Sequence, residues 1–266
     1  MSSSMWSMVV LMGSIVGFVA LQIDHKAYCN LPYCGMNNIV CQKANYSFIC
    51  RRSTRLVDLT SSQKDNLLHM VNDFRNRAAK GLTRTLHPAG RMVRISWSDE
   101  LEHFAKMDVM SCMPTPRPCM TSPNFPNIGS IFDTDGYMGP KQKSFSRIVN
   151  MVSKWTKEGR YVTRQQTIFL TDRSDQRSVF RPALLMADRN THMGCAAVKF
   201  SYQRFNYLYL SCTFATVNIL EAPIYRVAES PGIFCKERDE VYTNLCSVRE
   251  EYPENRKYVE LTRYMT

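Results

Sequence analysis

Apolar side chains recur every three or four residues in three stretches of the chain, the spacing that places them on one face of a helix. The first stretch holds Leu67, Val71, Phe74 and Ala78. We expect Ser62 to cap this helix, with Asp65 completing a variant of the capping box, and Gly81 to end it. A second helix is expected after the capping residue Ser98, and a third from about Ser144.

Alternating apolar and polar residues predict two strands, at 194–202 and 207–217, joined as a hairpin by residues 203–206. A short apolar segment, 179–187, precedes the first strand. The stretches 114–118 and 121–140 are rich in Pro, Gly, Asn or Asp, so we expect them to be loops. Helices separated by loops and followed by paired strands favour an α+β domain with an antiparallel sheet.

The first 23 residues contain no charged side chain, and residues 8–21 form the apolar run MVVLMGSIVGFVAL. This run is typical of a signal peptide and short for a transmembrane helix, which needs about 20 apolar residues. We therefore predict a signal peptide at 1–23. An uncleaved signal-anchor is the alternative, because the segment lacks Lys and Arg and Phe18 fits poorly three positions before a cut at Ala20. No second span and no GPI anchor are expected.

All 10 cysteines follow this segment, and none of them forms a C-x-x-C pair. An even count behind a signal peptide is typical of a disulfide framework, and no Cys or His pairs have the spacing of a zinc site. The sequon at Asn45 can accept a glycan in the same compartment. The sequence therefore predicts a secreted, extracellular and disulfide-rich protein.

The chain is basic, with 34 Lys and Arg against 23 Asp and Glu, a net charge of +11 and a pI near 9.2. Such a charge attracts nucleic acid, anionic lipid or acidic glycans. Here the basic residues are scattered and are not interleaved with aromatic residues in the pattern that stacks bases. We therefore expect no nucleic-acid partner, and outside the cell an anionic polysaccharide or a membrane is the better candidate.

Three patches along the chain are similar to the signatures of one known family. They are Asn72-Asp73-Phe74-Arg75, residues 181–195, which resemble H-[FY]-T-x-M-V-W running into Gly-Cys, and residues 209–214 (YLSCTF) followed by Asn218-Ile219. Their order and spacing, together with the cysteines, resemble the CAP superfamily of cysteine-rich secretory proteins, antigen-five venom allergens and plant pathogenesis-related proteins. The N-terminal cysteines look most like those of insect antigen-five proteins.

This resemblance covers roughly residues 29–219 and implies a three-layer α-β-α sandwich around a central antiparallel sheet. After the signal peptide we expect a Cys-rich extension at 24–58, a CAP domain at 59–222 and a C-terminal extension with a disulfide loop at 223–266. The family pairing implies Cys29–Cys41, Cys34–Cys119, Cys50–Cys112 and Cys195–Cys212, which leaves Cys235–Cys246. The expected hairpin supports Cys195–Cys212 independently, because it brings the two strands together.

Many CAP proteins have a cleft with two His and two acidic residues, a set that can hold a divalent cation. Spacing from the cysteines and a tryptophan places these four positions at Pro116, Ser130, Glu158 and Arg181. Pro116 offers no donor atom, Ser130 is a poor ligand, and Arg181 is an obligate cation that can pair with Glu158 instead. We therefore expect no metal, no cofactor and no catalytic residue here. A misalignment of the loops that carry the first two positions is the alternative that would restore a ligand.

No G-x-S-x-G, P-loop or H-E-x-x-H motif is present, and none of the five histidines has a recognisable catalytic context. The leading hypothesis is a secreted, monomeric, non-enzymatic CAP protein that binds an extracellular protein or lipid, in saliva, venom or reproductive fluid. The alternatives are a secreted hydrolase and a lipid or sterol carrier that uses the CAP cleft. The degenerate set of four residues argues against the hydrolase, and a carrier would require an apolar cavity.

Overall fold

The computed structural model describes residues 25–41, 53–82, 85–113, 117–140, 142–171 and 179–257, with the backbone alone at 25 and 26. The expected signal peptide, the sequon at Asn45, Cys50 and Pro116 lie outside these ranges. The helices of this part of the chain are α1 (His25–Cys29), α2 (Ser61–Ala79), α3 (Asp99–Met110), α4 (Ser144–Glu158), α5 (Arg164–Ile168) and α6 (Phe180–Met186). Short 3-10 helices lie at Gly35–Asn37, Gly159–Tyr161 and Pro253–Arg256.

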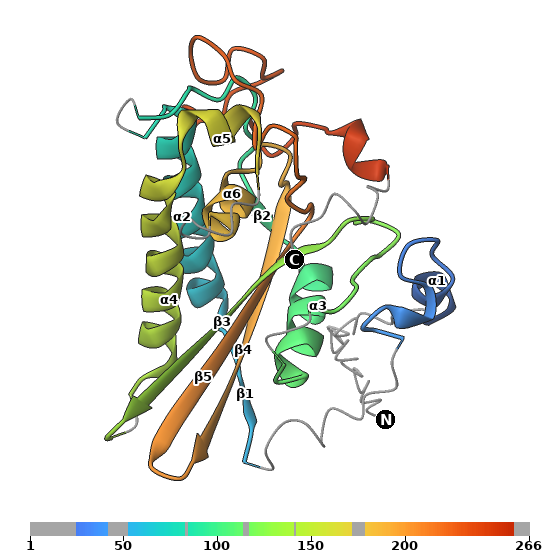
Figure 1. Ribbon diagram of the computed structural model, residues 1–266, viewed down its shortest axis with the longest axis vertical. Helices are drawn as coiled ribbons and strands as arrows, with labels where there is room; N and C mark the ends of the chain where they lie inside the picture. Colours follow the sequence, from blue (N-terminus) through green and yellow to red (C-terminus); the bar gives the residue numbers. More distant parts are fainter. Residues whose placement is uncertain are drawn as a thin grey trace, which may run out of the picture.

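The central sheet contains β1 (Arg55–Val57), β2 (Ser96–Trp97), β3 (Gly129–Met138), β4 (His192–Tyr202) and β5 (Phe205–Phe214). Four of these strands pair antiparallel in the order β1-β4-β5-β3. The short β2 is the exception, since it pairs in parallel with the start of β4. Helices α2, α4 and α6 cover one face of the sheet and α3 covers the other (Figure 1). The expected α+β fold, a three-layer α-β-α sandwich, is confirmed.

The caps of the long helices show how the sequence sets their ends. Ser98 caps α3 as expected, because its side chain accepts a hydrogen bond from the backbone N–H of Leu101. The expected cap of α2 at Ser62 is wrong: Thr60 and Gln63 form a reciprocal capping box there. Thr60 keeps the extended backbone that precedes the helix, so it takes the cap in place of Ser62. Beyond the end of α2, Gly81 adopts the positive φ of +100° that glycine allows.

Strand β3 corrects the expectation that residues 121–140 are all loop. Its 10 residues pair one to one with the whole of β5, from Gly129 opposite Phe214 to Met138 opposite Phe205. Gly and Asp have low strand propensity, so the segment lacks the local signal of a strand. Pairing with a buried neighbour decides its conformation instead.

The hairpin of β4 and β5 is present, with a tighter turn than expected. Tyr202 pairs with Phe205, so the connection is Gln203-Arg204 rather than residues 203–206, and Gln203 takes a φ of 54°. Cys195 lies directly opposite Cys212 in this register, and the two form a disulfide.

Among the described residues the structure also contains the expected bonds Cys29–Cys41, Cys34–Cys119 and Cys235–Cys246. Cys112 is disulfide-bonded as well. Its expected partner, Cys50, lies outside the described residues.

A close backbone contact holds α3 against the sheet. A Cβ atom built on Gly194 of β4 would lie 2.1 Å from the backbone nitrogen of Glu102 on α3. A residue without a side chain at this position is therefore what lets α3 approach the strand.

Arg75, from the first family-like patch, is a buried structural residue. Its guanidinium is fully inaccessible and donates to the carbonyl oxygens of Val93, Leu185 and Ala187 at 2.7–3.1 Å. Burial lowers its pKa to about 10. One side chain on α2 thus ties the loop before β2 to the end of α6.

The segments on either side of the family-like region pack onto the sandwich. Residues between α1 and Cys41 share a buried cluster with Leu101 and Phe104 of α3. At the other end, Tyr242 and Leu245 belong to the main core. None of the helices in the described part of the chain has the length and hydropathy needed to cross a bilayer.

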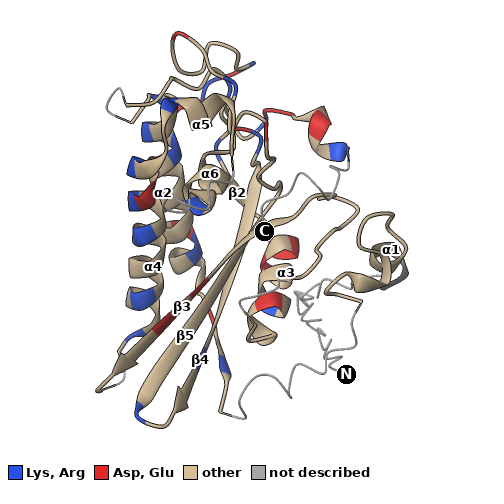
Figure 2. Ribbon diagram, viewed as in Figure 1, with Lys and Arg blue, Asp and Glu red and all other residues tan. Residues whose placement is uncertain are grey.

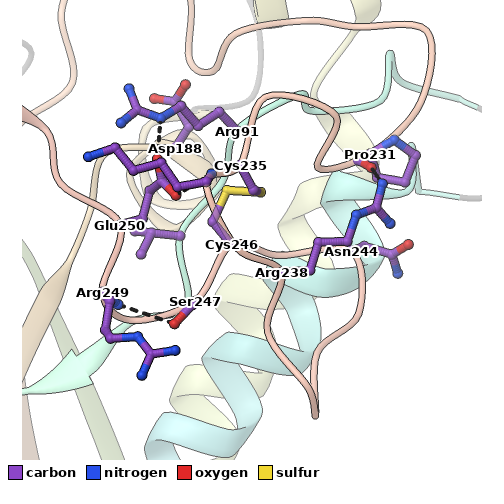
Figure 3. The surroundings of a disulfide bond; sticks show 12 residues. Arg91, Asp188, Pro231, Cys235, Arg238, Asn244, Cys246, Ser247, Arg249 and Glu250 are labelled. Atoms are coloured by element: carbon purple, nitrogen blue, oxygen red, sulfur yellow. Dashed lines mark hydrogen bonds and ion pairs between the residues drawn. A yellow bond between two sulfur atoms is a disulfide. The ribbon is translucent and has the colours of Figure 1, made fainter.

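The Cys235–Cys246 disulfide closes a loop near the C-terminus (Figure 3). Backbone hydrogen bonds fix this loop to the domain. The N–H of Cys246 donates to the Met92 carbonyl over 2.7 Å, and its carbonyl accepts from the N–H of Arg94 over 2.9 Å. Figure 3 also shows Glu250 beside Arg91, whose Nε lies 2.7 Å from Glu250 Oε1.

Candidate functional site

The cleft at the start of β3 contains two of the four family positions. It has a volume of about 180 Å³, and its lining includes Arg117, Ser130, Phe132, Phe180, Arg181 and Asn218. Ser130 lies on β3 and Arg181 on the first turn of α6. We call this the CAP cleft. Its lining contains two guanidinium groups and no His, Asp or Glu among the described residues.

Arg181 binds the one acidic residue that occupies a family position. Its Nη1 donates to Glu158 Oε1 over 3.0 Å, the pair expected from the sequence. Its other Nη lies 3.9 Å from Asp133 Oδ1 on β3. Asp133 in turn accepts from the indole N–H of Trp155 over 2.8 Å and lies 3.8 Å from Lys154. Side chains of α4, α6 and β3 thus share one network of compensated charges.

A second network lies on the α3 side of the cleft, around Asp108. The carboxylate of Asp108 is fully buried and accepts from Ser211 over 2.5 Å and from the guanidinium of Arg117. Arg117 also donates to Ser130 Oγ at 3.2–3.3 Å and lies 4.8 Å from the centre of the Phe132 ring. Burial raises the pKa of Asp108, and the charge of Arg117 opposes that rise.

Three members of these networks were not predicted from the sequence: Asp108, Arg117 and Asp133. The buried position of Asp108 could have been predicted from the sequence. Asp108 follows Ala105 by three residues and Phe104 by four, so it falls on the apolar face of its helix. A carboxylate on a buried helix face is costly unless a cation pairs with it. Arg117 lies within the Pro-rich stretch 114–118 and Asp133 lies in the strand that was not predicted, so neither residue had a local signal.

The side chains present in the CAP cleft do not fit a metal held by two His and two carboxylates. Ser130 Oγ accepts from Arg117, Arg181 is a cation, and the carboxylate of Glu158 is occupied by Arg181. Across the described residues, no group of three or more His, Cys, Asp and Glu is arranged to hold a metal ion. Pro116, the fourth position, lies outside the described residues.

The described histidine side chains lie outside the lining of the CAP cleft. His69 shares a 2.8 Å hydrogen bond with the hydroxyl of Tyr242, which links α2 to the C-terminal loop. His192 lies 2.9 Å from Thr191 Oγ1 and beside the ring of Phe125. Burial lowers the pKa of both His103 and His192. Neither a nucleophile–base pair nor a histidine is found in the described lining of the CAP cleft.

Comparison with known proteins places this geometry in a family. The model of the cysteine-rich secretory protein (CAP) family matches residues 68–214. Tabinhibitin 7 from Tabanus yao is 31% identical over 241 residues, which cover 88% of this chain and 91% of that protein. Venom allergen-1 from Aedes aegypti is 24% identical over 245 residues, which cover 91% and 95%.

Solved structures agree in fold. A crystal structure of NaASP2 with Zn²⁺ has a TM-score of 0.54 at 18% identity, covering 71% of this chain and 97% of that one. The structure of BmVAL-1 has the same TM-score, 0.54, at 17% identity, covering 73% and 97%. The family match, the insect relatives and the sandwich agree with one another: this chain belongs to the cysteine-rich secretory protein (CAP) family, and its relatives include insect antigen-five and venom-allergen proteins.

Proposed function

We propose that this protein is exported and acts outside the cell as a non-enzymatic CAP protein, by binding a protein or lipid partner. Its family is one of secretory proteins, and relatives carry names such as tabinhibitin and venom allergen. The disulfides described above are typical of chains that fold in an oxidising compartment. Saliva, venom and reproductive fluid are the sites of action that this kinship suggests.

The ion pair between Arg181 and Glu158 is the observation that carries the non-enzymatic part of the proposal. A carboxylate serves as a metal ligand or general base through its lone pairs, and here a guanidinium donates to Glu158 over 3.0 Å. Arginine itself stays protonated in proteins and cannot act as a base. With Ser130 bound to Arg117, the CAP cleft presents compensated charges rather than a reactive group.

A serine hydrolase in this cleft is the main alternative. It would need a base within hydrogen-bond reach of Ser130, and the neighbour at that distance is the Arg117 guanidinium. A guanidinium donor leaves the hydroxyl proton in place and does not raise the nucleophilicity of the oxygen. The geometry therefore favours binding over hydrolysis.

Elemental analysis of the secreted, folded protein tests the proposal. We expect no stoichiometric zinc in the wild type after dialysis against zinc-containing buffer, and no change in Glu158→Ala. As a positive control, Arg181→His combined with Ser130→Glu reintroduces two ligand types beside Glu158. One equivalent of zinc in the wild type that is lost in Glu158→Ala would overturn the non-enzymatic reading.

Two further measurements address the partner and the site of action. Native mass spectrometry of the protein from its secreting tissue, before and after organic extraction, separates a lipid partner from a protein partner. Accumulation of the full chain inside cells, with an intact N-terminus and reduced cysteines, would contradict export.

A further inference from the structure

A second cavity lies at the opposite end of the strands, beside the β4–β5 turn. Its volume is about 370 Å³, and its lining includes Arg55, Tyr137, Arg147, Lys199, Asn206 and Leu208. We call it the hairpin pocket. It shares no described lining residue with the CAP cleft. Its volume falls in the range of about 300–1,000 Å³ that is typical of small-ligand sites.

Two cations face each other across neighbouring strands in the hairpin pocket. In the β1–β4 register, Arg55 lies directly opposite Lys199, so both side chains lie on the same face of the sheet. Both residues are exposed. Like charges directly opposite one another destabilise a sheet, and a bound anion between them would remove that repulsion.

The register continues this row across the sheet. Lys199 is opposite Leu208 on β5, and Leu208 is opposite Asp135 on β3. Leu208 is 2% exposed and forms an apolar floor between the cations and the acid. The carboxylate of Asp135 forms a salt bridge with Arg147 of α4 rather than with Arg55 or Lys199.

Arg147 supplies a third, fixed cation. Its guanidinium binds Asp135, donates to Gln142 Oε1 over 2.7 Å and lies 3.9 Å from the centre of the Tyr137 ring. A planar guanidinium held by an acid and an aromatic ring keeps its orientation before any ligand arrives. Figure 2 shows Lys and Arg positions on β1 and at the β4–β5 turn, at this end of the sheet.

The remaining lining provides neutral hydrogen-bonding groups. Ser53, Ser144 and Ser201 bring hydroxyl groups, and Gln142 and Asn206 bring amides. The described lining contains no Asp or Glu. Hydroxyls and amides suit the hydroxyl groups of a sugar, an aromatic ring suits its apolar face, and basic side chains suit its anionic substituents.

We propose that the hairpin pocket binds a sulfated saccharide unit of an extracellular polysaccharide. Arg55 and Lys199 approach from two strands, and a sulfate group offers several acceptor oxygens to their guanidinium and ammonium groups. Arg147 adds a guanidinium donor whose charge is already matched by Asp135. The inference rests on the extracellular location in the proposed function, and it adds a ligand class and a site away from the CAP cleft.

Isothermal titration calorimetry of the purified protein with a heparin-derived hexasaccharide tests the inference, at about 0.15 M salt, where exposed charges are strongly screened. The test variant is Arg55→Ala with Lys199→Ala. The matched control is Lys80→Ala with Lys236→Ala, which removes two exposed cations at the end of α2 and in the C-terminal loop. Lys199→Gln alone is the second test variant, because it leaves β1 intact if the double variant folds poorly.

We expect the test variant to weaken the Kd about tenfold or more and Lys199→Gln to weaken it by about threefold, while the control stays within about twofold. A hyaluronan hexasaccharide, which carries carboxylates without sulfate, and inorganic sulfate alone should each bind at least about tenfold more weakly than the sulfated hexasaccharide.

Several outcomes would overturn the inference. Absence of binding to the wild type is one. Equal losses of affinity in the test and control variants are another, because they would show that binding depends only on the net charge of the protein. Equal binding of hyaluronan would replace sulfate by carboxylate as the recognised group and so reject the stated ligand. These failures leave the proposed function standing, whereas stoichiometric zinc in the CAP cleft would overturn that function without changing saccharide binding.

Discussion

Arg181 at the start of α6 donates a 3.0 Å hydrogen bond to Glu158 at the end of α4, where relatives of this fold are expected to place a histidine and a glutamate. The side chains are 33% and 18% exposed, so the pair is partly shielded from water. An Arg at this position neutralises Glu158 directly, whereas a His there could share a metal ion with Glu158. The pair also joins α4 and α6, two helices that contact each other.

We predict that Arg181→Met lowers the free energy of unfolding by about 1 kcal/mol, because a partly exposed charged hydrogen bond is lost. A double-mutant cycle with Glu158→Gln, followed by urea denaturation, should give a coupling energy of about 0.5–1 kcal/mol. Lys157→Met, on the same helical turn, serves as the control. Additive effects of the two changes would show that the pair contributes nothing to stability.

We predict that Arg117→Met destabilises the protein by about 3–5 kcal/mol at neutral pH, because it leaves the carboxylate of Asp108 buried without its cation. Adding Asp108→Asn to this variant should recover much of the loss, since a neutral amide can still bond to Ser211. Recovery of less than about 1 kcal/mol would show that Arg117 acts through packing on Phe132 rather than through Asp108.

The same variant should have a distinct pH dependence. The folded-state pKa of Asp108 is raised by burial, so between its ordinary value and this raised value the folded state binds more protons than the unfolded state. Stability is therefore lost as the pH rises through that window. Removing Arg117 raises the folded-state pKa of Asp108 further, so the loss of stability extends to higher pH and becomes larger. Urea denaturation should show a smaller penalty for Arg117→Met at about pH 4.5 than at about pH 7.

Sequence patterns among near neighbours predicted much of this fold, and there is a physical reason for each element that they did not predict. Ser98 and the alternating residues of β4 and β5 act through near neighbours, so the sequence shows them directly. Strand β3 depends on its pairing with β5, a segment more than 60 residues away, and its Gly and Asp residues give it no local strand signal. The choice of Thr60 over Ser62 depends on where the chain leaves its extended conformation, which propensity does not determine.

The contacts of the candidate site also include one that the sequence predicted and one that it did not. The pair of Arg181 and Glu158 was predictable because the family motifs fix both positions relative to Cys195 and Trp155. The contact of Asp108 with Arg117 was not, because Arg117 is placed by a loop that a disulfide at Cys119 anchors to the N-terminal segment. Long-range covalent anchoring of this kind leaves no periodic pattern in the sequence.

We predict that Arg75→Met lowers the free energy of unfolding by about 3–5 kcal/mol, since the carbonyl groups of Val93, Leu185 and Ala187 lose their donors inside the core. Arg75→Lys should recover little of this loss, because an ammonium cannot reach three carbonyls spread around a planar fork. Arg77→Met, two residues away and exposed on the same helix, should change stability by less than about 0.5 kcal/mol. Equal effects at Arg75 and Arg77 in chemical denaturation would contradict the assigned role.

The close packing of α3 on β4 leads to a steric prediction at Gly194. Gly194→Ala adds a Cβ atom that would lie 2.1 Å from the backbone nitrogen of Glu102, and backbone cannot move aside as a side chain tip can. We expect a loss of more than about 3 kcal/mol in the free energy of unfolding, or a large drop in the yield of folded protein. Gly136→Ala on β3 is the matched control, because its Cβ would meet only the ring of Tyr207, at 3.2 Å. A Gly194→Ala protein within about 1 kcal/mol of the wild type would mean that α3 does not approach the sheet as closely as described, since no rotation of a methyl group relieves that overlap.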